Sequence, residues 1–320
     1  MQNVNQNEHG LANVNPKKEK KPFKEVFWSR KGQRNFWGYT FVAPALIIFV
    51  LFTVLPIILS FTLGFTNIKS PASSNYKFTG LANFRFLFNS NPSFWKGMKN
   101  ILLYTVITVP LTLTGSMILA LIVKKPIAGT KFFRGVFYLP GITSGVATAM
   151  VWSYLLNGTN GIINQGIAGI NNLFGFELIP KILLAVESTA LWGIILMTLW
   201  GALGGNMVLF LASMNSIPTS IFEAAEVDGA NRFQTFFRVT LPMMKPSIFF
   251  ALTLSLIGTP QMFEPIILMN ARTVTPVYEI YKNAMDNGMM SLAIAQSIVL
   301  FAFIMMITFV MQKTNKESYI

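Results

Sequence analysis

Long apolar stretches alternate with short polar segments along most of the chain. The first stretch, residues 36–65, contains no charged residue and exceeds the roughly 20 residues that a helix needs to cross a bilayer. Five further stretches approach or exceed that length, and only the one at 247–270 contains a charged residue. These stretches are residues 101–123, 135–156, 188–212, 247–270 and 289–311. The pattern predicts an all-α, polytopic membrane protein with six transmembrane helices.

Polar residues dominate both ends of the chain. The N-terminal segment is rich in Asn, Lys and Glu without apolar periodicity, which predicts a largely disordered tail. Within it, Phe23, Phe27 and Trp28 are expected to lie on the membrane surface. The apolar stretch that follows is too long for a signal-peptide core, so we expect it to remain as a spanning helix. The predicted order is a tail at 1–35, a six-helix domain at 36–312 and a second tail at 313–320.

The basic residues predict the orientation of this domain. The chain has 25 Lys and Arg against 12 Asp and Glu, for a net charge of +13. If the N-terminus is cytoplasmic, cytoplasmic segments hold 17 of these basic residues and outer segments hold 8. This bias favours both termini inside, although five of the outer eight lie in the first outer loop. Because the basic residues flank apolar stretches, membrane topology explains them, and we expect no nucleic-acid partner.

Side chains for catalysis or metal binding are scarce. The chain has no Cys, which excludes disulfides, thiol catalysis and zinc thiolate sites, and its single His, His9, lies in the polar tail. No group of acids gathers at one membrane depth, which disfavours a membrane-embedded enzyme. The sequence contains no GxxxxGK[ST] phosphate loop to cradle ATP. We therefore expect that the chain is not an enzyme and binds no metal or cofactor itself.

Pro and Gly residues interrupt several predicted spans. GxxxG spacing at Gly141/Gly145 and at Gly201/Gly205 permits close helix contact. Packing alone can explain such residues, but broken helices at mid-membrane depth also suit a protein that opens and closes a cavity. The other interrupting residues are Pro56, Pro110, Pro140, Gly204, Pro260 and Pro265.

Three carboxylates gather between the fourth and fifth spans of this acid-poor chain. They lie in the stretch IPTSIFEAAEVDGANRF and are Glu223, Glu226 and Asp228. Ser220 is predicted to cap a helix that starts at Ile221, with Glu223 at the third position of a capping box. Gly229 is expected to end this helix after about two turns.

A capped connector with a solvated acidic face would explain each of these residues separately. It would not explain the apolar helical run that follows, in which three Phe recur before two Pro break the chain. Ala224 and Ala225 also leave one side of the helix almost without side chains, so another protein could approach it closely. The residues of the run are Phe233, Phe236, Phe237, Pro242 and Pro246.

The segment EAAEVDGANRFQTFFRVTLPMMKP resembles the EAA signature of permease subunits in binding-protein-dependent ABC importers. More narrowly, it is similar to the carbohydrate-uptake family that includes the maltose and glycerol-phosphate permeases, through EAA, DGA, LP and the further Pro. The resemblance extends from the first predicted span to the last. It is also carried by Pro140, Trp152, Gly161 and Asn164 in the third-span region, and by Trp200 and the Ile217–Pro218 pair after the fourth span.

The resemblance implies that residues 220–229 form a coupling helix that docks in a cleft of a cytoplasmic ATPase. The position of Glu223 contacts the ATPase in this family, and that of Gly229 turns the chain. A short rigid helix suits the transmission of a rigid-body movement, and a carboxylate can pair with a basic group. The implied coupling residues are Glu223, Ala224, Ala225, Asp228 and Gly229.

The resemblance further implies a type I importer permease fold in a bacterial plasma membrane. The implied cargo is a sugar, an oligosaccharide or a related polyol. The implied partners are a second homologous permease subunit, two cytoplasmic ABC ATPase subunits and an extracellular or periplasmic solute-binding protein. ATP and Mg²⁺ would be used by the ATPase and not by this chain.

The resemblance also places a substrate path along the fourth and fifth spans near mid-membrane. Thr and Gln can hydrogen-bond sugar hydroxyls, and Trp offers an apolar face, although each residue also fits plain packing. The implied positions are Thr198, Trp200, Gly201, Thr259, Gln261, Met262 and Glu264, with Gly141 and Gly145 in the third span. Family members often have Asp in place of Glu264 and a GGP run soon after. This chain has MNARTVTPVYEIYKNAM there, so its outer loop and substrate contacts can differ.

Glu264 supports an alternative hypothesis. A carboxylate inside an apolar stretch is costly and indicates function, so Glu264 could be the proton or cation site of an ion-coupled secondary transporter. It could equally lie near the outer end of the fifth span, hydrogen-bonded or in water. A secondary transporter needs no docking helix, so dependence on an ATPase distinguishes the two hypotheses.

Overall fold

The computed structural model describes residues 30–70, 72–73, 76–125 and 129–316. His9 and the three aromatic residues of the predicted tail therefore lie outside the described residues. The chain divides into two compact units, Met1–Leu59 and Ser60–Ile320. Among the described residues, helices and loops make up both units, and the one extended pairing is an isolated bridge between Thr66 and Phe78.

The helices follow one another in the order that the apolar pattern predicts, with several short helices between them. They are α2 (Arg30–Phe49), a π-helical turn η1 (Val50–Val54), α3 (Leu55–Leu63), α4 (Ala82–Ser90), α5 (Pro92–Lys124), α6 (Thr130–Ile142), α7 (Gly145–Leu155), α8 (Ile162–Phe174), α9 (Glu187–Asn215), α10 (Thr219–Val227), α11 (Arg232–Thr235), η2 (Phe236–Thr240), α12 (Leu241–Met243), α13 (Lys245–Gly258), η3 (Thr259–Gln261), α14 (Glu264–Leu268), α15 (Pro276–Tyr281), η4 (Lys282–Asp286) and α16 (Met290–Lys316).

Four of the described helices are long and apolar enough to cross a membrane: Phe36–Leu63, Pro92–Lys124, Glu187–Asn215 and Met290–Lys313. Two further pairs of helices pass the same test together if each pair is one span, which brings the count to six. One pair is bent by 97° between Ile142 and Gly145, and the other by 64° between Met243 and Lys245. The all-α architecture with six predicted spans is thus consistent with the structure, but two spans are broken.

The first span agrees with the prediction, although α2 already begins at Arg30, inside the predicted tail. Pro56 does not end this helix. A π turn precedes it, in which the Leu55 N–H donates to the Val50 carbonyl, and such turns accommodate a residue that has no N–H of its own. The span is apolar on all sides and none of its best 18-residue window is buried in the chain, as expected for a helix that contacts lipid.

The continuous helix predicted over residues 135–156 is wrong. The chain leaves the helical conformation at Thr143 and Ser144, whose ψ angles are 143° and 131°. Pro140 and Gly141 weaken the turn before this break, since Pro removes a backbone donor and Gly lowers helix stability. The third span is therefore α6 followed by α7 at a steep angle.

The fifth helix predicted over residues 247–270 is also wrong in its second half. Helical structure stops at Gln261, and Met262 is extended with a ψ of 124°. A new short helix, α14, then begins at Glu264 with Pro265 in its first turn. Proline is favoured at that position and cannot continue a helix from the preceding turn, which explains why the apolar run folds as two elements.

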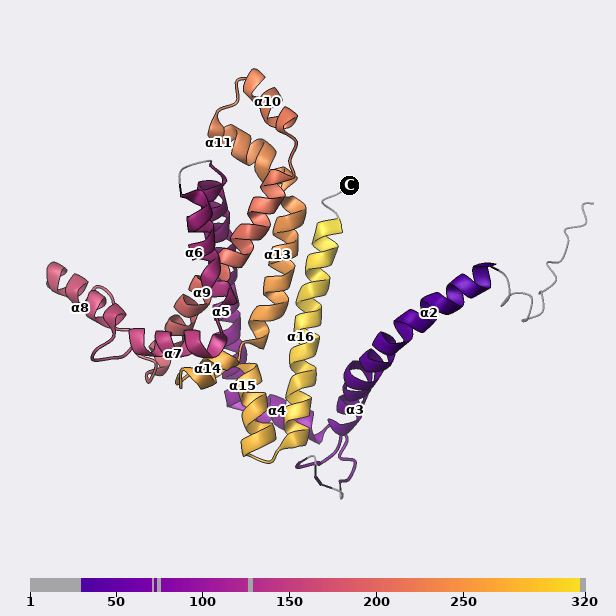
Figure 1. Ribbon diagram of the computed structural model, residues 1–320. Coiled ribbons are helices and arrows are strands. Elements are labelled where there is room, and N and C mark those ends of the chain that lie inside the picture. Colours follow the sequence, from indigo (N-terminus) through magenta and orange to yellow (C-terminus); the bar gives the residue numbers. More distant parts are fainter. Residues whose placement is uncertain (1–29, 71, 74–75, 126–128, 317–320) are drawn as a thin grey trace, which may run out of the picture. The chain divides into compact units, whose positions relative to one another are not determined.

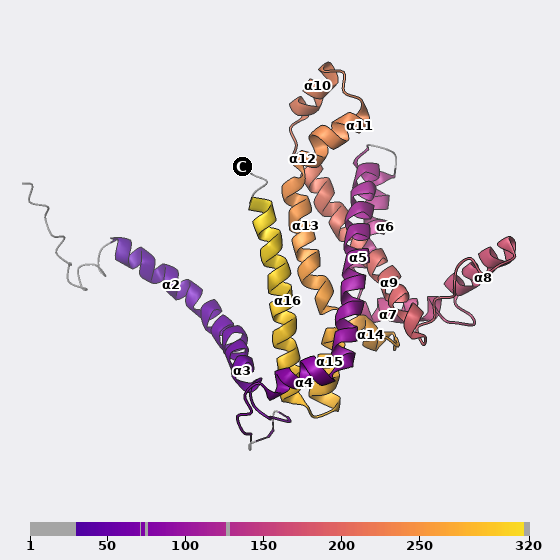
Figure 2. The same ribbon diagram turned by 180° about the vertical axis from the view of Figure 1, so that it is seen from behind.

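The second unit is organised around α5 and α9, which run side by side in both views (Figures 1 and 2). α10 and α11 lie at one end of this unit, and α4, α14 and α15 lie at the other. Two large buried apolar clusters lie along α5 and α9, and a third, smaller cluster contains Leu87, Phe94 and Leu292. One large cluster contains Ile101, Trp152 and Ile194 toward the α15 end. The other large cluster contains Met117, Met207 and Phe210 toward the α10 end.

Close contact between α6 and α9 depends on glycine. A Cβ on Gly204 would lie 2.0 Å from the Phe137 carbonyl oxygen, and one on Gly141 would lie 3.0 Å from the Gly201 carbonyl oxygen. The predicted close contact is therefore confirmed for Gly141, which meets the backbone of Gly201. An added Cβ on Gly201 or on Gly205 has nothing within 4 Å, so neither of these two positions requires glycine for the contact.

Candidate functional site

The acidic stretch forms α10, which begins at Thr219 with Pro218 as N-cap and no side-chain cap. The predicted cap at Ser220 and the capping box with Glu223 are therefore wrong. Pro218 has φ −58° and ψ 137° and brings the chain into the helix before Ser220. A capping box does occur in the next helix, between Asn231 and Gln234, where the N-x-x-Q spacing in the sequence could have indicated it.

The end of α10 agrees with the prediction. Gly229 has a φ of +75°, a conformation that L-residues with a Cβ rarely adopt. The Gly229 N–H donates to the Glu226 carbonyl at 3.0 Å, and the Ala230 N–H donates to the Ala225 carbonyl at 2.9 Å. This pair of bonds is a Schellman motif, which satisfies carbonyls that a helix end leaves open.

One face of α10 packs against its own chain. Ile221 and Phe222 pack against the apolar cluster at this end, and the Lys124 Nζ lies 4.6 Å from the centre of the Phe222 ring. Ala225 is also buried, with 9% of its surface exposed. The expectation that Ala225 is open to a partner is therefore wrong, because it lies on the packed face of the helix.

The other face of α10 is open. Its side chains include all three acids of the stretch, and Val227 is 87% exposed, the most exposed of the large apolar side chains in the described chain. The acidic face of α10 is therefore accessible to solvent or to another protein. The exposed members are Glu223, Ala224, Glu226, Val227 and Asp228.

A cavity of about 250 Å³ lies between the two apolar clusters, near the middle of α5 and α9. Its lining is rich in hydroxyl groups and contains no charged residue among the described residues. The lining residues are Tyr104, Thr108, Val109, Thr112, Thr198, Ala202, Asn206, Ser255, Gly258, Thr259 and Met262.

Hydrogen bonds hold part of this lining in place. The Tyr104 hydroxyl donates to Thr198 Oγ1 at 2.9 Å, which joins α5 to α9. The Thr105 hydroxyl donates to Thr259 Oγ1 at 3.1 Å, which joins α5 to η3. The hydroxyls of Thr108 and Thr112 are buried and find no partner within the described part of the chain. Since buried polar groups normally have a partner, these two hydroxyls are available to water or a ligand.

Three of the predicted path residues meet in this cavity: Thr198, Thr259 and Met262. The Gln261 amide instead donates to the Ile257 carbonyl of α13, the helix that directly precedes it, at 2.8 Å. Trp200 is 44% exposed and packs edge-on against Trp152, with ring centres 6.2 Å apart.

Of the remaining predicted path residues, Glu264, Gly141 and Gly145 are exposed and Gly201 is half-buried. Glu264 is exposed at the start of α14, and a Cβ on Gly145 would lie 3.7 Å from its Oε2 atom. Gly141 is exposed above Gly201.

Sequence reasoning missed the contribution of the second span. Thr105, Thr108 and Thr112 recur there at intervals of three and four residues in an otherwise apolar stretch. That spacing places hydroxyls on one face of a helix, so the pattern could have predicted a polar face. Asn206 on α9 was likewise not singled out, although it is the one amide within the predicted stretch 188–212.

Comparison with known proteins identifies the family. Residues 100–315 match the family described as "Binding-protein-dependent transport system inner membrane component". The chain belongs to this family. It is 35% identical over 290 residues to "Probable ABC transporter permease protein YesP" of Bacillus subtilis (strain 168), covering 88% of this chain and 91% of that protein.

Two further similarities bear on this permease. It is 28% identical over 297 residues to "Multiple sugar-binding transport system permease protein MsmF" of Streptococcus mutans, covering 90% of this chain and 98% of that protein. It also shares the fold of a chain in a bacterial ABC transporter involved in the import of the acidic polysaccharide alginate, with a TM-score of 0.77 and 24% identity over 92% of this chain and 98% of that chain.

The permease is thus a multi-pass membrane component of a binding-protein-dependent transport system, as the EAA resemblance implied. The ion-coupled alternative built on Glu264 gains no support from these relatives.

Proposed function

We propose that this permease imports a sugar, an oligosaccharide or a related polyol, using energy from a separate cytoplasmic ATPase. The observation that carries the proposal is the hydroxyl-lined cavity between two apolar clusters. The Streptococcus mutans relative, whose name is that of a permease in a multiple sugar-binding transport system, supports the same substrate class.

The chemistry of the cavity suits a neutral, hydroxyl-rich substrate. Hydroxyl and amide groups both donate and accept hydrogen bonds, as sugar hydroxyls do. The unpartnered hydroxyls of Thr108 and Thr112 would gain a partner when such a substrate, or water, enters. The absence of a charge among the described lining residues favours a neutral sugar unit over an ion.

The cavity is small for a complete substrate site. Ligand pockets usually measure about 300–1,000 Å³, whereas this one measures about 250 Å³. We propose that a second, homologous permease subunit completes the path. Trp200 and Glu264, with Gly141, Gly145 and Gly201, would then lie toward that subunit, with Gln261 beside them.

α10 would couple the permease to ATP hydrolysis by a partner subunit. Its exposed carboxylates and Val227 would contact one of two ABC ATPase subunits, and Gly229 would fix the direction in which the chain returns to the membrane. ATP and Mg²⁺ would be held by those subunits. Binding of the loaded receptor outside and of ATP inside would together favour the outward-facing state, and hydrolysis would reset it.

The experiment is ATP-dependent uptake of labelled neutral oligosaccharides into proteoliposomes that contain the permease with its partner subunits and a loaded binding protein. Replacing Thr108 and Thr112 together by Val removes both free hydroxyls, and we expect uptake to fall about tenfold, in line with the loss of two hydrogen bonds. Co-elution with the ATPase reports assembly of the variant.

The matched control is Thr114→Val. Thr114 lies on the same helix, but its hydroxyl is exposed and donates to the Pro110 carbonyl at 2.6 Å. Uptake by this variant should equal that of the wild type. Uptake that persists without ATP and follows an ion gradient would instead favour a secondary transporter and refute the proposal.

A further inference from the structure

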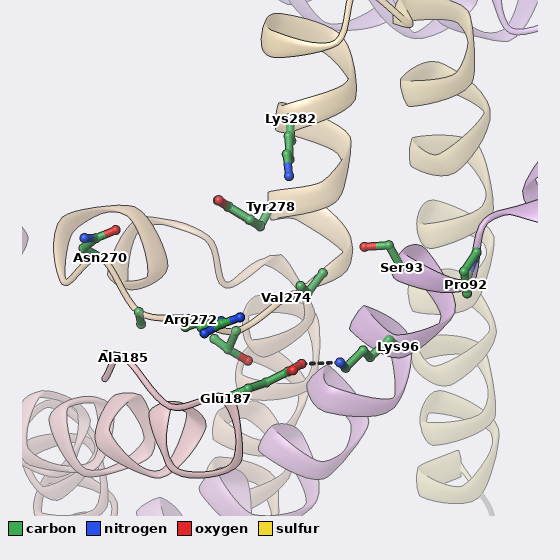
Figure 3. A pocket seen from close by; sticks show the side chains of 12 residues that line it. Pro92, Ser93, Lys96, Ala185, Glu187, Asn270, Arg272, Val274, Tyr278 and Lys282 are labelled. Carbon is green, nitrogen blue, oxygen red and sulfur yellow. Dashed lines mark ion pairs between the residues drawn. The ribbon is translucent and has the colours of Figure 1, made fainter. Parts of the chain in front are cut away.

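A second and larger cavity opens where the starts of α5 and α9 meet, at the end of the unit opposite α10 (Figure 3). It measures about 870 Å³ and is formed by the start of α5, the start of α9, the loop after α14, and the α15–η4 segment. Its charged lining residues are the cations Lys96, Arg272 and Lys282 and the single acid Glu187. We call this cavity the basic pocket.

One ion pair crosses the basic pocket. Lys96 on α5 pairs with Glu187 on α9, as the dashed line in Figure 3 marks. The two side chains are 54% and 43% exposed. Exposed ion pairs contribute little net stability, so an incoming carboxylate can replace one partner easily. Arg272 and Lys282 are exposed and form no ion pair with a described residue.

The elements that meet at the basic pocket also line the hydroxyl-rich cavity deeper in the chain. α5 provides Lys96 to the pocket and Tyr104 to the cavity, and α9 provides Glu187 and Thr198. The ion pair therefore joins the ends of the two long helices that enclose the cavity.

The floor of the basic pocket is attached to the same cavity. The Asn100 side chain on α5 donates to the Val274 carbonyl at 2.9 Å. The Thr275 hydroxyl donates to the carbonyl of Met262 at 3.0 Å, and Met262 lines the cavity. A Cβ on Gly97 would lie 2.8 Å from the Thr275 carbonyl carbon, so α5 packs directly on this loop. These contacts connect the loop at the pocket floor to a residue of the cavity lining.

We propose that the basic pocket receives an acidic side chain of the solute-binding protein, and that this carboxylate competes with Glu187 for Lys96. The inference rests on the proposed function, which makes a loaded binding protein the partner outside the membrane. With three cations and one acid, the pocket has a net positive charge that complements an acidic surface. Arg272 and Lys282 bind the incoming group, and Lys96 turns from Glu187 toward it.

The consequence is that docking of the binding protein is linked to separation of the ends of α5 and α9. When Lys96 leaves Glu187, α9 loses its ionic contact with α5 at this end of the two helices. Docking of the binding protein would thereby favour separation of these helix ends, which is the movement that admits a substrate from outside. A neutral sugar does not supply the carboxylate, so the binding protein itself provides the signal.

The test measures ATP hydrolysis by the complete complex in proteoliposomes as a function of the concentration of a loaded binding protein that stimulates the wild type. In the double variant Arg272→Glu and Lys282→Glu, the concentration for half-maximal stimulation should rise at least about tenfold, because like charges then meet. The control Lys99→Glu makes a single charge reversal of the same kind at an exposed α5 residue outside the pocket and should leave that concentration unchanged.

A second variant tests the competition. Glu187→Gln removes the competing carboxylate, so the half-maximal concentration should fall about threefold or more, in the direction opposite to the double variant. A rise would overturn the competition. If the double variant does not assemble with the ATPase, Arg272→Gln alone gives the same direction of change.

The remaining outcomes are distinct. If no loaded binding protein stimulates the wild type, the proposed function itself fails. If the wild type is stimulated but the charge reversals leave the half-maximal concentration unchanged, the proposed function stands and the basic pocket is not the docking site. Selective loss of acidic oligosaccharide uptake with an unchanged dependence on the binding protein would assign the pocket to the substrate and overturn the inference.

Discussion

Gly204 lies at the closest approach of α6 and α9. An added Cβ would be 2.0 Å from the Phe137 carbonyl oxygen, which is backbone and cannot turn aside as a flexible side chain would. The pair of small residues Gly141 and Gly201 extends the same contact by way of a carbonyl oxygen. A single added atom on Gly204 or Gly141 therefore decides whether the two helices can meet at this distance.

Replacing Gly204 by Ala should destabilise the permease by roughly 1–3 kcal/mol, the usual effect of overpacking. The measurement is the thermal unfolding midpoint of the detergent-purified complex. Gly205→Ala is the control at the next residue, where an added Cβ meets nothing, and Ala is the better helix former. Equal midpoints for the two variants would show that α6 and α9 can separate without loss.

For single residues, the sequence predicts those roles that follow from an unusual backbone conformation. The GANR segment after the acids already indicates that Gly229 ends a helix, and its φ of +75° agrees. The burial of Ala225 could not be predicted, because two adjacent Ala give no sign of which one faces the core. The same holds for the choice between Gly204 and Gly205, which only the helix rotation determines.

α10 is the element on which the proposed coupling depends. It is held on one face by Ile221 and Phe222 and ends in the Schellman motif at Gly229, while its acidic face is open. A helix that is packed on one face and exposed on the other can transmit a movement of a bound partner to the transmembrane helices on which it packs.

The backbone conformation at the C-terminal end of α10 should therefore affect the coupling of ATP hydrolysis to uptake. Gly229→Val forces a β-branched residue toward a left-handed conformation, which costs about 1–2 kcal/mol or more, and we expect ATP-dependent uptake to fall severalfold. Gly229→Asn should retain most uptake, because Asn tolerates this conformation. Uptake in proteoliposomes measures both variants, and equal uptake by the two would show that the turn geometry does not matter.

The two broken spans show that hydropathy predicts apolar stretches but not the breaks of a helix within them. An apolar window of about 20 residues averages over two extended residues, so the change of direction at Thr143 and Ser144 leaves no trace in it. The Pro and Gly residues around positions 140, 260 and 265 indicated weak points, but not which of them ends a helix. Pro56 and Pro110, by contrast, lie within helical segments.

For the whole molecule, the six-span count, the all-α class and the family could all be predicted from the sequence, because long apolar stretches and the EAA segment are local signals. The hydroxyl-lined cavity and the basic pocket could not. Each assembles residues from three or more elements far apart in the chain, and only packing of α5 against α9 brings them together.

The most direct measurement is site-specific cross-linking from α10 to a co-purified ATPase. The natural chain has no Cys, so a single introduced Cys is the only thiol in this subunit. Val227→Cys, on the open face, should cross-link to the ATPase, whereas Ala225→Cys, on the buried face, should not. If Cys at neither Ala224 nor Val227 captures an ATPase in a complex that hydrolyses ATP, α10 does not couple this permease to its energy source.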